Sequence, residues 1–273
     1  MANGVFTAEA LQGRVALITG GGSGIGFGIA KAMIAAGAKV AVASRDFEKL
    51  TKSAEALRAL GGEVLTVQAD VRLPEQVDAA VKATVDAFGG LDIMVANAAG
   101  NFVVPVADMS VNAWKVVIDI DLNGTFYCAK AAYPYLKASS FGGRLLAIST
   151  MRAMEGWPGC AHAGAAKAGI MSLIRSLSAE WGVDGILCNT IAPGAIGDTV
   201  GVQKIYSDQG VAAAQLAQIP LGRLGLIKDI ANAAIYLCSD AGSYITGSDL
   251  VVDGGRQRRM QETAPASPQA LAS

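Results

Sequence analysis

Short apolar runs alternate with longer segments of helical periodicity along most of the chain. The runs are rich in β-branched residues and are apolar at consecutive positions, which is typical of parallel strands buried on both faces. Between them lie segments such as FEKLTKSAEALRALG and LPEQVDAAVKATVDAFG, whose apolar residues recur every three or four positions. The pattern predicts strands at Val15–Thr19, Lys39–Ala43, Glu63–Gln68, Asp92–Ala96, Arg144–Ser149, Ile186–Ile191 and Asp249–Val252.

This alternation predicts the fold class. Repeated strand–helix–strand units form right-handed crossovers, which build a doubly wound sheet. We therefore expect a single-domain, Rossmann-like α/β fold with about seven parallel strands and helices on both faces. The 273 residues suit one such domain. We expect an N-terminal extension at residues 1–12, the domain at 13–255 and a flexible tail at 256–273.

Composition and charge narrow the class of protein. The formal net charge is −1 and 16% of the residues are charged, so electrostatics gives no reason to expect a nucleic acid or an anionic membrane as partner. The four cysteines lack metal-site spacing and suit a reducing compartment as small core residues. We see no secretory signal pattern, no apolar run of transmembrane length and no Ser-Lys-Leu ending. We expect a cytoplasmic protein without a bound metal.

The segment Thr19-Gly-Gly-Gly-Ser-Gly-Ile-Gly26 joins the first predicted strand to a helix expected at Ile25–Ala36. Gly20, Gly24 and Gly26 allow a tight turn and the close approach of a pyrophosphate to the amino terminus of that helix. A glycine-rich turn between a strand and a helix is the context in which this motif indicates dinucleotide binding. Taken alone, the segment also fits a sharp connection, so the assignment depends on the rest of the chain.

The spacing Thr-Gly-x-x-x-Gly-x-Gly resembles the short-chain dehydrogenase/reductase family. Motifs after later strands match as well, at Asp70-Val71, Asn97–Gly100, Pro193–Thr199 and Val252–Gly255, although Ala98 departs from the family's Asn-Asn-Ala-Gly. The resemblance covers about Gly13–Gly255 and implies a nicotinamide cofactor. By motif position it implies cofactor contacts from Gly20, Ser23, Gly24, Ile25, Gly26, Ser44, Arg45, Asp70, Val71, Asn97, Ala98, Gly100, Lys167, Pro193, Gly194, Ile196 and Thr199.

The end of the second predicted strand favours NADPH over NADH. An acidic residue there would bind the ribose hydroxyls of NAD and repel a 2′-phosphate. Ser44 and Arg45 stand there instead, and a hydroxyl and a guanidinium suit a phosphate. Asp46 is expected to begin the next helix rather than to face the ribose. The alternative is that Arg45 is a solvated surface charge.

Three positions depart from the pattern of ordinary members of the family. Those members use a Tyr, which stands four residues before a Lys, to protonate a carbonyl oxygen. A Ser orients the substrate, and an Asn holds a water relay. Aligned on Lys167, these positions hold Ala163, Thr150 and Asp121. Alanine has no ionisable proton, and a general acid contributes about 10²–10⁴ in rate. We therefore do not expect an ordinary alcohol dehydrogenase.

Reduction of a conjugated C=C bond needs no acid at the moment of hydride transfer, because hydrogen-bond donors can hold the enolate until carbon is protonated. The motifs His162–Lys167 and Asp121–Phe126 resemble those of the peroxisomal-type 2,4-dienoyl-CoA reductases, a branch of the family. The resemblance implies Asp121, Lys167 and Asp253 as catalytic residues, with the two Asp residues positioning a water. It implies NADPH-dependent reduction of 2,4-dienoyl-CoA to 3-enoyl-CoA in unsaturated fatty acid degradation.

Other interpretations stay open at this point. Asp253 also fits a turn, and Asp121 also fits a pair at a sheet–helix interface. His162 is five positions from Lys167, about 140° around a helix, which favours a structural role at the start of that helix. One alternative function is a reductase of another oxo or enoyl substrate, with its acid rebuilt from Arg152, Asp121 or His162. Another is a non-catalytic NADP(H)-binding sensor or scaffold.

Two further regions are expected to make contacts. Trp157 and the loop Gly201–Gln218 are expected to touch the substrate, because the family covers its site there. The helices expected at Asn112–Ala138 and Cys160–Trp181 are apolar and rich in alanine. The family pairs these helices between subunits, so the resemblance implies a homotetramer.

Overall fold

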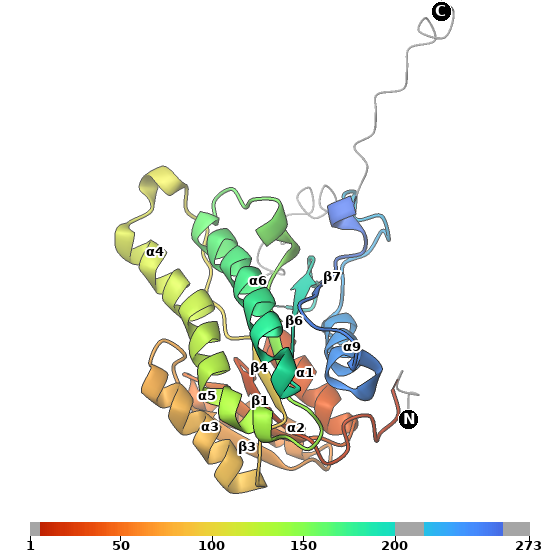
Figure 1. Cartoon of the computed structure of the whole chain (residues 1–273). Helices are drawn as coiled ribbons and strands as arrows, with labels where there is room; N and C mark the ends of the chain where they lie inside the picture. The colour runs from red at the N-terminus through yellow and green to blue at the C-terminus, as the bar shows by residue number, and fades with distance from the viewer. Residues whose placement is uncertain (1–5, 200–215, 259–273) are drawn as a thin grey trace, which may run out of the picture.

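The computed structural model describes residues 6–199 and 216–258. In them, seven strands form one parallel sheet in the order β3-β2-β1-β4-β5-β6-β7 (Figure 1). The predicted α/β class is confirmed, and the strand ends differ from the predicted ones by at most two residues. The strands are β1 Val15–Thr19, β2 Lys39–Ser44, β3 Val64–Gln68, β4 Ile93–Ala96, β5 Arg144–Ile148, β6 Leu187–Pro193 and β7 Asp249–Val252.

Helices cover both faces of this sheet. One face carries α1 Gly24–Ala35, α2 Phe47–Arg58 and α9 Ile227–Cys238, and the other carries α3 Pro74–Phe88, α5 Gly124–Ala138 and α6 Ala161–Trp181. The shorter segments are α4 Val111–Ile118, η1 Val106–Asp108, η2 Asp119–Asn123, η3 Met151–Met154, η4 Gly182–Asp184, η5 Asp240–Gly242 and η6 Arg256–Arg258.

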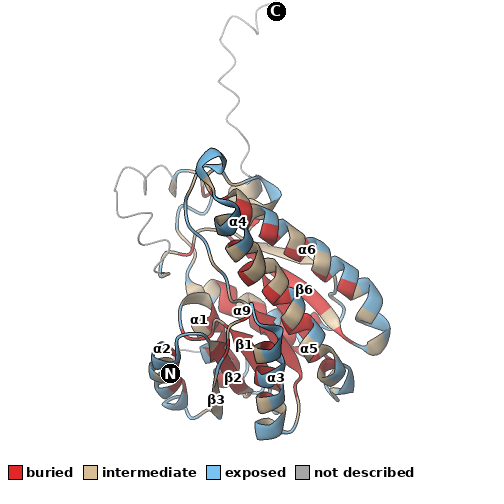
Figure 2. Ribbon diagram, turned by 90° about the vertical axis from the view of Figure 1, so that its left-hand side faces the viewer, coloured by how far each residue is buried: buried red, intermediate tan, exposed pale blue. Residues whose placement is uncertain are grey.

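The core has two layers, one on each side of the sheet. Successive residues of a strand point to opposite faces, so a strand covered on both sides needs apolar residues at every position. In β1, Ala16 and Ile18 join the core under α1 and α9, whereas Val15 and Leu17 join the core under α3 and α5. Figure 2 shows the buried positions along the strands and the inner sides of the helices. The two layers explain the unbroken apolar runs of the sequence.

The order of the strands places a crevice at the centre of the sheet. β1 pairs with β2 on one side and with β4 on the other, and the chain proceeds outward from this point in both directions. Open α/β sheets bind ligands at such a switch point, outside the carboxyl ends of the strands. The segments that follow β1, β2 and β4 are therefore the place to look for a cofactor site.

The helix expected at Asn112–Ala138 is helical from Val111 to Ala138, but it contains a π-helical turn that the prediction did not include. α4 ends in a π-helical turn, η2, before α5 begins. A π turn places an extra residue in a helix, and such turns are frequent at functional sites. Asp121 is the middle residue of this turn, so the irregularity falls on a predicted catalytic position.

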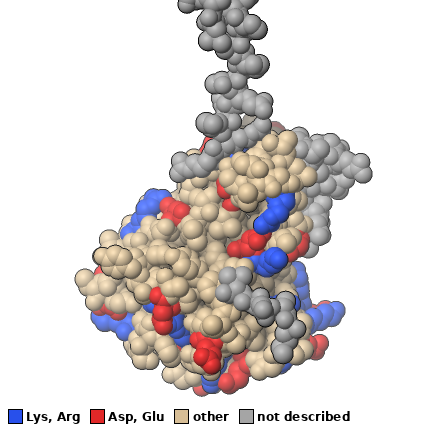
Figure 3. Space-filling view, turned by 90° about the vertical axis from the view of Figure 1, so that its right-hand side faces the viewer, with Lys and Arg blue, Asp and Glu red and all other residues tan. Residues whose placement is uncertain are grey.

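Charge is spread thinly over the face of the molecule drawn in Figure 3. On the face seen in Figure 3, lysines and arginines are interspersed with acidic residues among larger uncharged areas. Within the described ranges, no helix combines the length and apolar character needed to span a bilayer. The same part of the chain contains no cluster of three or more His, Cys, Asp or Glu residues suited to a metal ion.

All four cysteines are free and buried, as the sequence predicts for core residues. Burial raises the pKa of the Cys128, Cys188 and Cys238 thiols to about 12. Because the thiolate is the reactive form, thiols with so high a pKa are inert at neutral pH. These three residues therefore contribute packing rather than chemistry.

Candidate active site

The glycine-rich loop between β1 and α1 is open above the start of the helix. Gly20 and Gly24 have φ angles of +66° and +54°, a region that glycine adopts without strain. A Cβ added to Gly24 would meet no atom within 4 Å. Ser23, the N-cap of α1, makes no side-chain cap bond, so the first N–H groups of the helix are available to an anion.

Gly26 is required for close packing instead. A Cβ at this position would lie 2.5 Å from Asn97 Nδ2 and 2.6 Å from the carbonyl oxygen of Gly20. α1 therefore approaches the ends of β1 and β4 more closely than any side chain would permit. The neighbouring residue Ile25 packs against the core on the α1 side of the sheet.

Asn97 and Ala98 form the floor of the site beneath this loop. Asn97 Nδ2 donates to the carbonyl of Thr19 at 2.9 Å, and Thr19 Oγ1 accepts the N–H groups of Asn97 and Ala98, each at 3.1 Å. These bonds join the carboxyl ends of β1 and β4. The sequence motifs did not single out Thr19. The feature that could have indicated it is a hydroxyl side chain at the end of the strand, directly before the glycines.

A hollow at the ends of β2 and β3 collects the residues predicted at the adenosine end of the cofactor. It has a volume of about 110 Å³. Arg45 and Asp70 also line an adjoining open hollow, together with Gln68, Leu73 and Gln76. The structure thus brings the predicted residues of four strand ends together, those of β1, β2, β3 and β4. The smaller hollow is lined by Gly20, Ala43, Ser44, Arg45, Ala69, Asp70, Val71, Ala98, Ala99 and Ile120.

Arg45 is exposed in this hollow, and Asp46 begins α2 as predicted. Asp46 Oδ1 accepts the N–H of Lys49 at 3.0 Å, which makes Asp46 the N-cap of the helix. The acidic side chain nearest to Arg45 in sequence is therefore engaged at the helix terminus. Ser44 at the end of β2 and Arg45 directly after it are the polar side chains that this segment contributes to the hollow.

Asp121 and Lys167 meet in the interior of the protein. Asp121 Oδ1 accepts the N–H of Gly100 at 2.7 Å, and Asp121 Oδ2 lies 3.4 Å from Lys167 Nζ. Lys167 Nζ also donates to the carbonyl oxygen of Ile148 at 2.8 Å. Only 1% of Asp121 and 7% of Lys167 is exposed. The pair therefore connects the loop after β4, the π turn, the end of β5 and α6.

Ala163 stands one helical turn before Lys167 and is enclosed by apolar side chains. It is 1% exposed and packs in a small cluster with Val117, Cys160 and Trp157. Ordinary family members carry the Tyr acid at this position, which here holds a closely packed apolar side chain. It holds no group that can donate a proton.

Thr150 and His162 are both tied to nearby backbone. Thr150 Oγ1 accepts the N–H of Arg152 at 3.3 Å and donates to the carbonyl of Pro193 at 3.5 Å. His162 is fully buried; its Nδ1 accepts the N–H of Ala163 at 2.8 Å, and its ring meets Phe102 edge-on at 4.6 Å between centroids. These contacts give His162 the structural position at the start of α6 that helix geometry favoured.

The segment after β6 lies against the turn after β7. Pro193 ends β6, and a Cβ on Gly194 would lie 2.7 Å from the Cα of Asp253. The side chain of Ile196 is buried in the core, and Thr199 Oγ1 donates to the carbonyl of Ile196 at 2.8 Å. Ile196 therefore offers a ligand its backbone rather than its side chain.

Asp253 holds the turn that follows β7. Its Oδ1 accepts the N–H of Gly255 at 2.8 Å and its Oδ2 accepts the N–H of Gln257 at 2.7 Å. Within the described ranges, no hydrogen bond or ion pair joins Asp253 to Asp121. The structure therefore places the two carboxylates in separate networks and gives Asp253 the contacts of a turn residue.

The region expected to touch the substrate is described in part. Trp157 lines an open hollow of about 420 Å³ beside α6, together with Arg152, which pairs with Glu155 at 3.6 Å. The loop Gly201–Gln218 lies outside the described residues except for positions 216–218.

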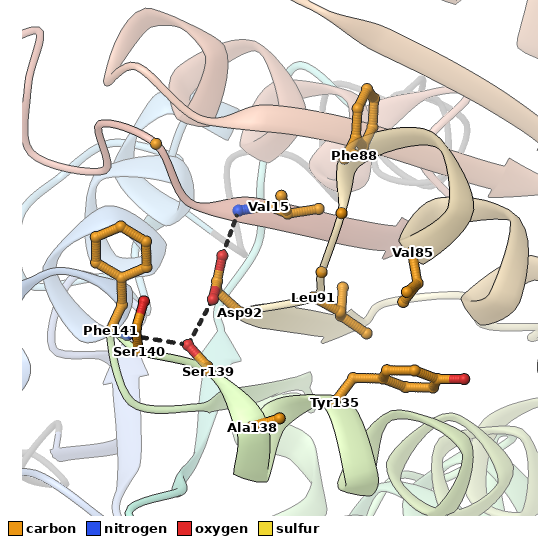
Figure 4. A pocket seen from close by; sticks show the side chains of 13 residues that line it. Val15, Val85, Phe88, Leu91, Asp92, Tyr135, Ala138, Ser139, Ser140 and Phe141 are labelled. Atoms are coloured by element: carbon orange, nitrogen blue, oxygen red, sulfur yellow. Dashed lines mark hydrogen bonds between the residues drawn. The ribbon is translucent and has the colours of Figure 1, made fainter.

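Another hollow, at the opposite edge of the sheet, has a different character. Its volume is about 310 Å³, and its walls include Phe88, Tyr135 and Phe141 (Figure 4). Its carboxylate, Asp92, already accepts the N–H of Val15 at 2.7 Å and the hydroxyl of Ser139 at 2.5 Å. The polar groups here hold the amino-terminal edge of the sheet together, so we assign the site to the carboxyl edge.

Known proteins resemble this chain over most of its length. Residues 20–257 match a family model described as "Enoyl-(Acyl carrier protein) reductase". A peroxisomal 2,4-dienoyl-CoA reductase of Danio rerio, named as (3E)-enoyl-CoA-producing, is 41% identical over 92% of this chain and 84% of its own length. A Bacillus subtilis (strain 168) protein named "probable 2,4-dienoyl-CoA reductase", (2E)-enoyl-CoA-producing, is 39% identical over 90% of this chain and 97% of its own.

A solved structure matches as well. The crystal structure of a short chain dehydrogenase from Bacillus anthracis str. 'Ames Ancestor' superposes with a TM-score of 0.83 and 38% identity, over 92% of this chain and 99% of that chain. The fold and the similarity to these reductases define an oxidoreductase built on a Rossmann-like sheet. Within that class, the chain belongs to the short-chain dehydrogenase/reductase family.

Proposed function

We propose that this protein is an NADPH-dependent reductase of conjugated enoyl thioesters, which converts 2,4-dienoyl-CoA to 3-enoyl-CoA in the degradation of unsaturated fatty acids. One observation carries the proposal. A buried Asp121–Lys167 pair stands beside a buried alanine, where an alcohol dehydrogenase of this family would carry its acid. The relative from Danio rerio is named for the same reaction and product.

The residues present fit NADPH. The open space at Gly24 and the uncapped start of α1 suit a pyrophosphate. The hollow lined by Ser44, Arg45 and Asp70 suits the adenosine end, and its exposed guanidinium suits a 2′-phosphate. When bound, NADPH supplies the hydride.

Lys167 is proposed to hold the nicotinamide ribose close to the reacting atoms. An ammonium has three N–H donors; one of them donates to the carbonyl of Ile148, and the carboxylate of Asp121 lies 3.4 Å from Nζ as the ion-pair partner. A remaining donor can reach a ribose hydroxyl. Asp121 thereby fixes the orientation of the Lys167 side chain. A buried ion pair is suited to this role, because leaving either buried charge without its partner would cost about 3–5 kcal/mol of free energy.

Asp121 is also the proposed source of the proton. Hydride addition to C5, the terminal diene carbon, moves an electron pair through the conjugated system onto the thioester oxygen. Protonation of the resulting dienolate at C2 leaves the double bond between C3 and C4. Asp121 is proposed to pass a solvent proton to this carbon through water, after hydride transfer. Asp253 is proposed to support the site by holding the turn against Gly194.

The decisive assay compares two thioesters of equal length. NADPH consumption would be followed with 2,4-hexadienoyl-CoA and with 3-ketohexanoyl-CoA. Because the site lacks an acid for an alkoxide, we expect kcat/KM for the dienoyl thioester to be larger by about 10²-fold or more. A faster reaction with the ketone would overturn the proposal. Cofactor binding without turnover of either thioester would indicate a sensor instead.

The proposed enzyme is a cytoplasmic homotetramer. The free, buried cysteines suit a reducing compartment. Large apolar side chains are exposed on the α4–α5 helix pair, including Val111 at 70%, Trp114 at 40% and Phe126 at 44%. Exposed apolar patches of this kind mark contact surfaces between chains.

A further inference from the structure

Asp70 and Arg72 form a close pair at the mouth of the adenosine hollow. Arg72 Nε donates to both carboxylate oxygens, at 3.1 and 3.0 Å, and Arg72 Nη2 lies 2.5 Å from Oδ2. The backbone N–H of Arg72 also donates to Asp70 Oδ1 at 3.0 Å. The hydrogen bond with the Arg72 side chain is the main reason why the pKa of Asp70 is lowered. The carboxylate is therefore engaged along its whole edge.

The same carboxylate lies within reach of the charge on Arg45. Both residues line the small hollow and the adjoining open one, and the charge of Arg45 contributes to the lowered pKa of Asp70. Gln76 Oε1 accepts the N–H of Asp70 at 2.9 Å, and Gln68 Nε2 donates to the carbonyl of Arg45 at 3.0 Å. These bonds hold the backbone of both residues, which line the same two hollows.

An unpaired Asp70 would oppose NADPH in two ways. It would repel the 2′-phosphate, and it would attract the Arg45 guanidinium away from that phosphate. NADH lacks the phosphate, so neither effect would reach it. A cation paired with Asp70 counters both effects, and Arg72 is paired with this carboxylate.

We propose that Arg72 is a specificity-determining residue, which neutralises Asp70 and so leaves Arg45 free to bind the 2′-phosphate of NADPH. The inference rests on the proposed preference of this protein for NADPH. It assigns the preference to three residues from two loops: Arg45 attracts the phosphate, Asp70 opposes it, and Arg72 cancels Asp70.

The test is a double-mutant cycle on Asp70 and Arg72. The Kd values of NADPH and NADH are measured for the wild type, Arg72→Gln, Asp70→Asn and the double variant. The quantity compared is the ratio of the two Kd values, since adenine contacts are common to both cofactors and cancel. We expect Arg72→Gln to lower the preference for NADPH about tenfold, the effect of one uncompensated nearby charge. Asp70→Asn in the same chain should restore the preference to within about twofold.

The controls separate this inference from the cofactor assignment. Arg58→Gln removes an equal charge from the end of α2, where Arg58 bonds the carbonyl of Val64, and should leave the ratio unchanged. A wild type that prefers NADH would refute the cofactor assignment. A wild type that prefers NADPH, with an unchanged ratio in Arg72→Gln or no recovery in the double variant, would refute the role of Arg72 alone. Asp70→Asn by itself keeps the test valid if Arg72→Gln folds poorly, because it should match or exceed the wild-type preference.

Discussion

At the scale of the residue, Asp121 has both a structural role and a proposed catalytic role. Its two oxygens contact the N–H of Gly100 and the ammonium of Lys167, so the carboxylate holds in place the lysine that is proposed to bind the cofactor. The same carboxylate is the ionisable group proposed to serve the dienolate. An ordinary member of the family divides these tasks between an Asn and a Tyr.

Replacement of Asp121 by Asn keeps the shape of the side chain and removes its ionisable group. The amide oxygen can still accept from Gly100, but the ionisable group and the charge opposite Lys167 are lost. We expect dienoyl-CoA turnover to fall by about 10²-fold or more, the usual scale for loss of a general acid, with NADPH affinity little changed. Lys167→Ala should instead impair cofactor binding and turnover together, as separate Kd and kcat measurements would reveal.

A matched control is available two residues away. Asp119 lies on the same π turn and accepts from Asn123 Nδ2 at 2.7 Å, so Asp119→Asn makes the same chemical change away from Lys167. Its turnover should stay near that of the wild type. Wild-type turnover in Asp121→Asn would eliminate Asp121 as the acid and make Arg152 and His162 the next residues to test.

Arg45 carries the attraction for the 2′-phosphate in this account. Arg45→Ala should weaken NADPH binding about tenfold or more, since a charge-assisted hydrogen bond is worth about 1.5–3 kcal/mol. NADH binding should be almost unaffected. Titration of both cofactors under one ionic strength checks this, and an equal loss for both would place the specificity elsewhere.

At the scale of the element, the strands were predictable and the irregular helix was not. Burial on both faces demands apolar residues in every strand, and this leaves a signal in the sequence. The periodicity through residues 112–138 does not mark the π turn, because the Asp121 contacts with Gly100 and Lys167 that accompany it come from distant segments. The Asp70-Val71 motif likewise located Asp70 in the sequence. Its bond to Arg72, however, depends on the backbone conformation of the loop after β3.

The glycines of the phosphate loop provide a test at this scale. Gly26→Ala would place a methyl group 2.5 Å from Asn97 Nδ2 and 2.6 Å from the backbone oxygen of Gly20. We expect a loss of about 1–3 kcal/mol in unfolding free energy, typical of overpacking, and a large loss of NADPH affinity. Gly22→Ala is the control, because its Cβ would lie no closer than 3.6 Å to any neighbour. Denaturant unfolding and cofactor titration of both variants would decide; similar behaviour of the two would contradict the packing argument.

At the scale of the whole molecule, one sheet serves two purposes. Its carboxyl edge gathers the cofactor loops, and its helices carry apolar side chains to the surface on α4 and α5. The sequence motifs predicted most of the positions at that edge, because loops after parallel strands share one edge. For Asp253 they left a catalytic role and a turn role open, and the structure shows both carboxylate oxygens bonded within the turn.

The exposed side chains of α4 and α5 should be covered in solution. We expect light scattering at micromolar concentration to give the mass of a homotetramer, in which these helices pair between subunits. Trp114→Glu would place a charge in that contact and should shift the mass downward. A monomeric mass for the wild type would contradict the assembly.

The central claim is that hydride and proton reach different carbons of a conjugated thioester, without an acid at the Ala163 position. The most direct measurement is one turnover of 2,4-hexadienoyl-CoA with NADPH that carries deuterium at the transferable position of the nicotinamide, followed by NMR of the product. We predict deuterium on C5, a solvent proton on C2 and a double bond between C3 and C4. Deuterium on C3 or on the carbonyl carbon, a 2-enoyl product, or no reduction at all would contradict it.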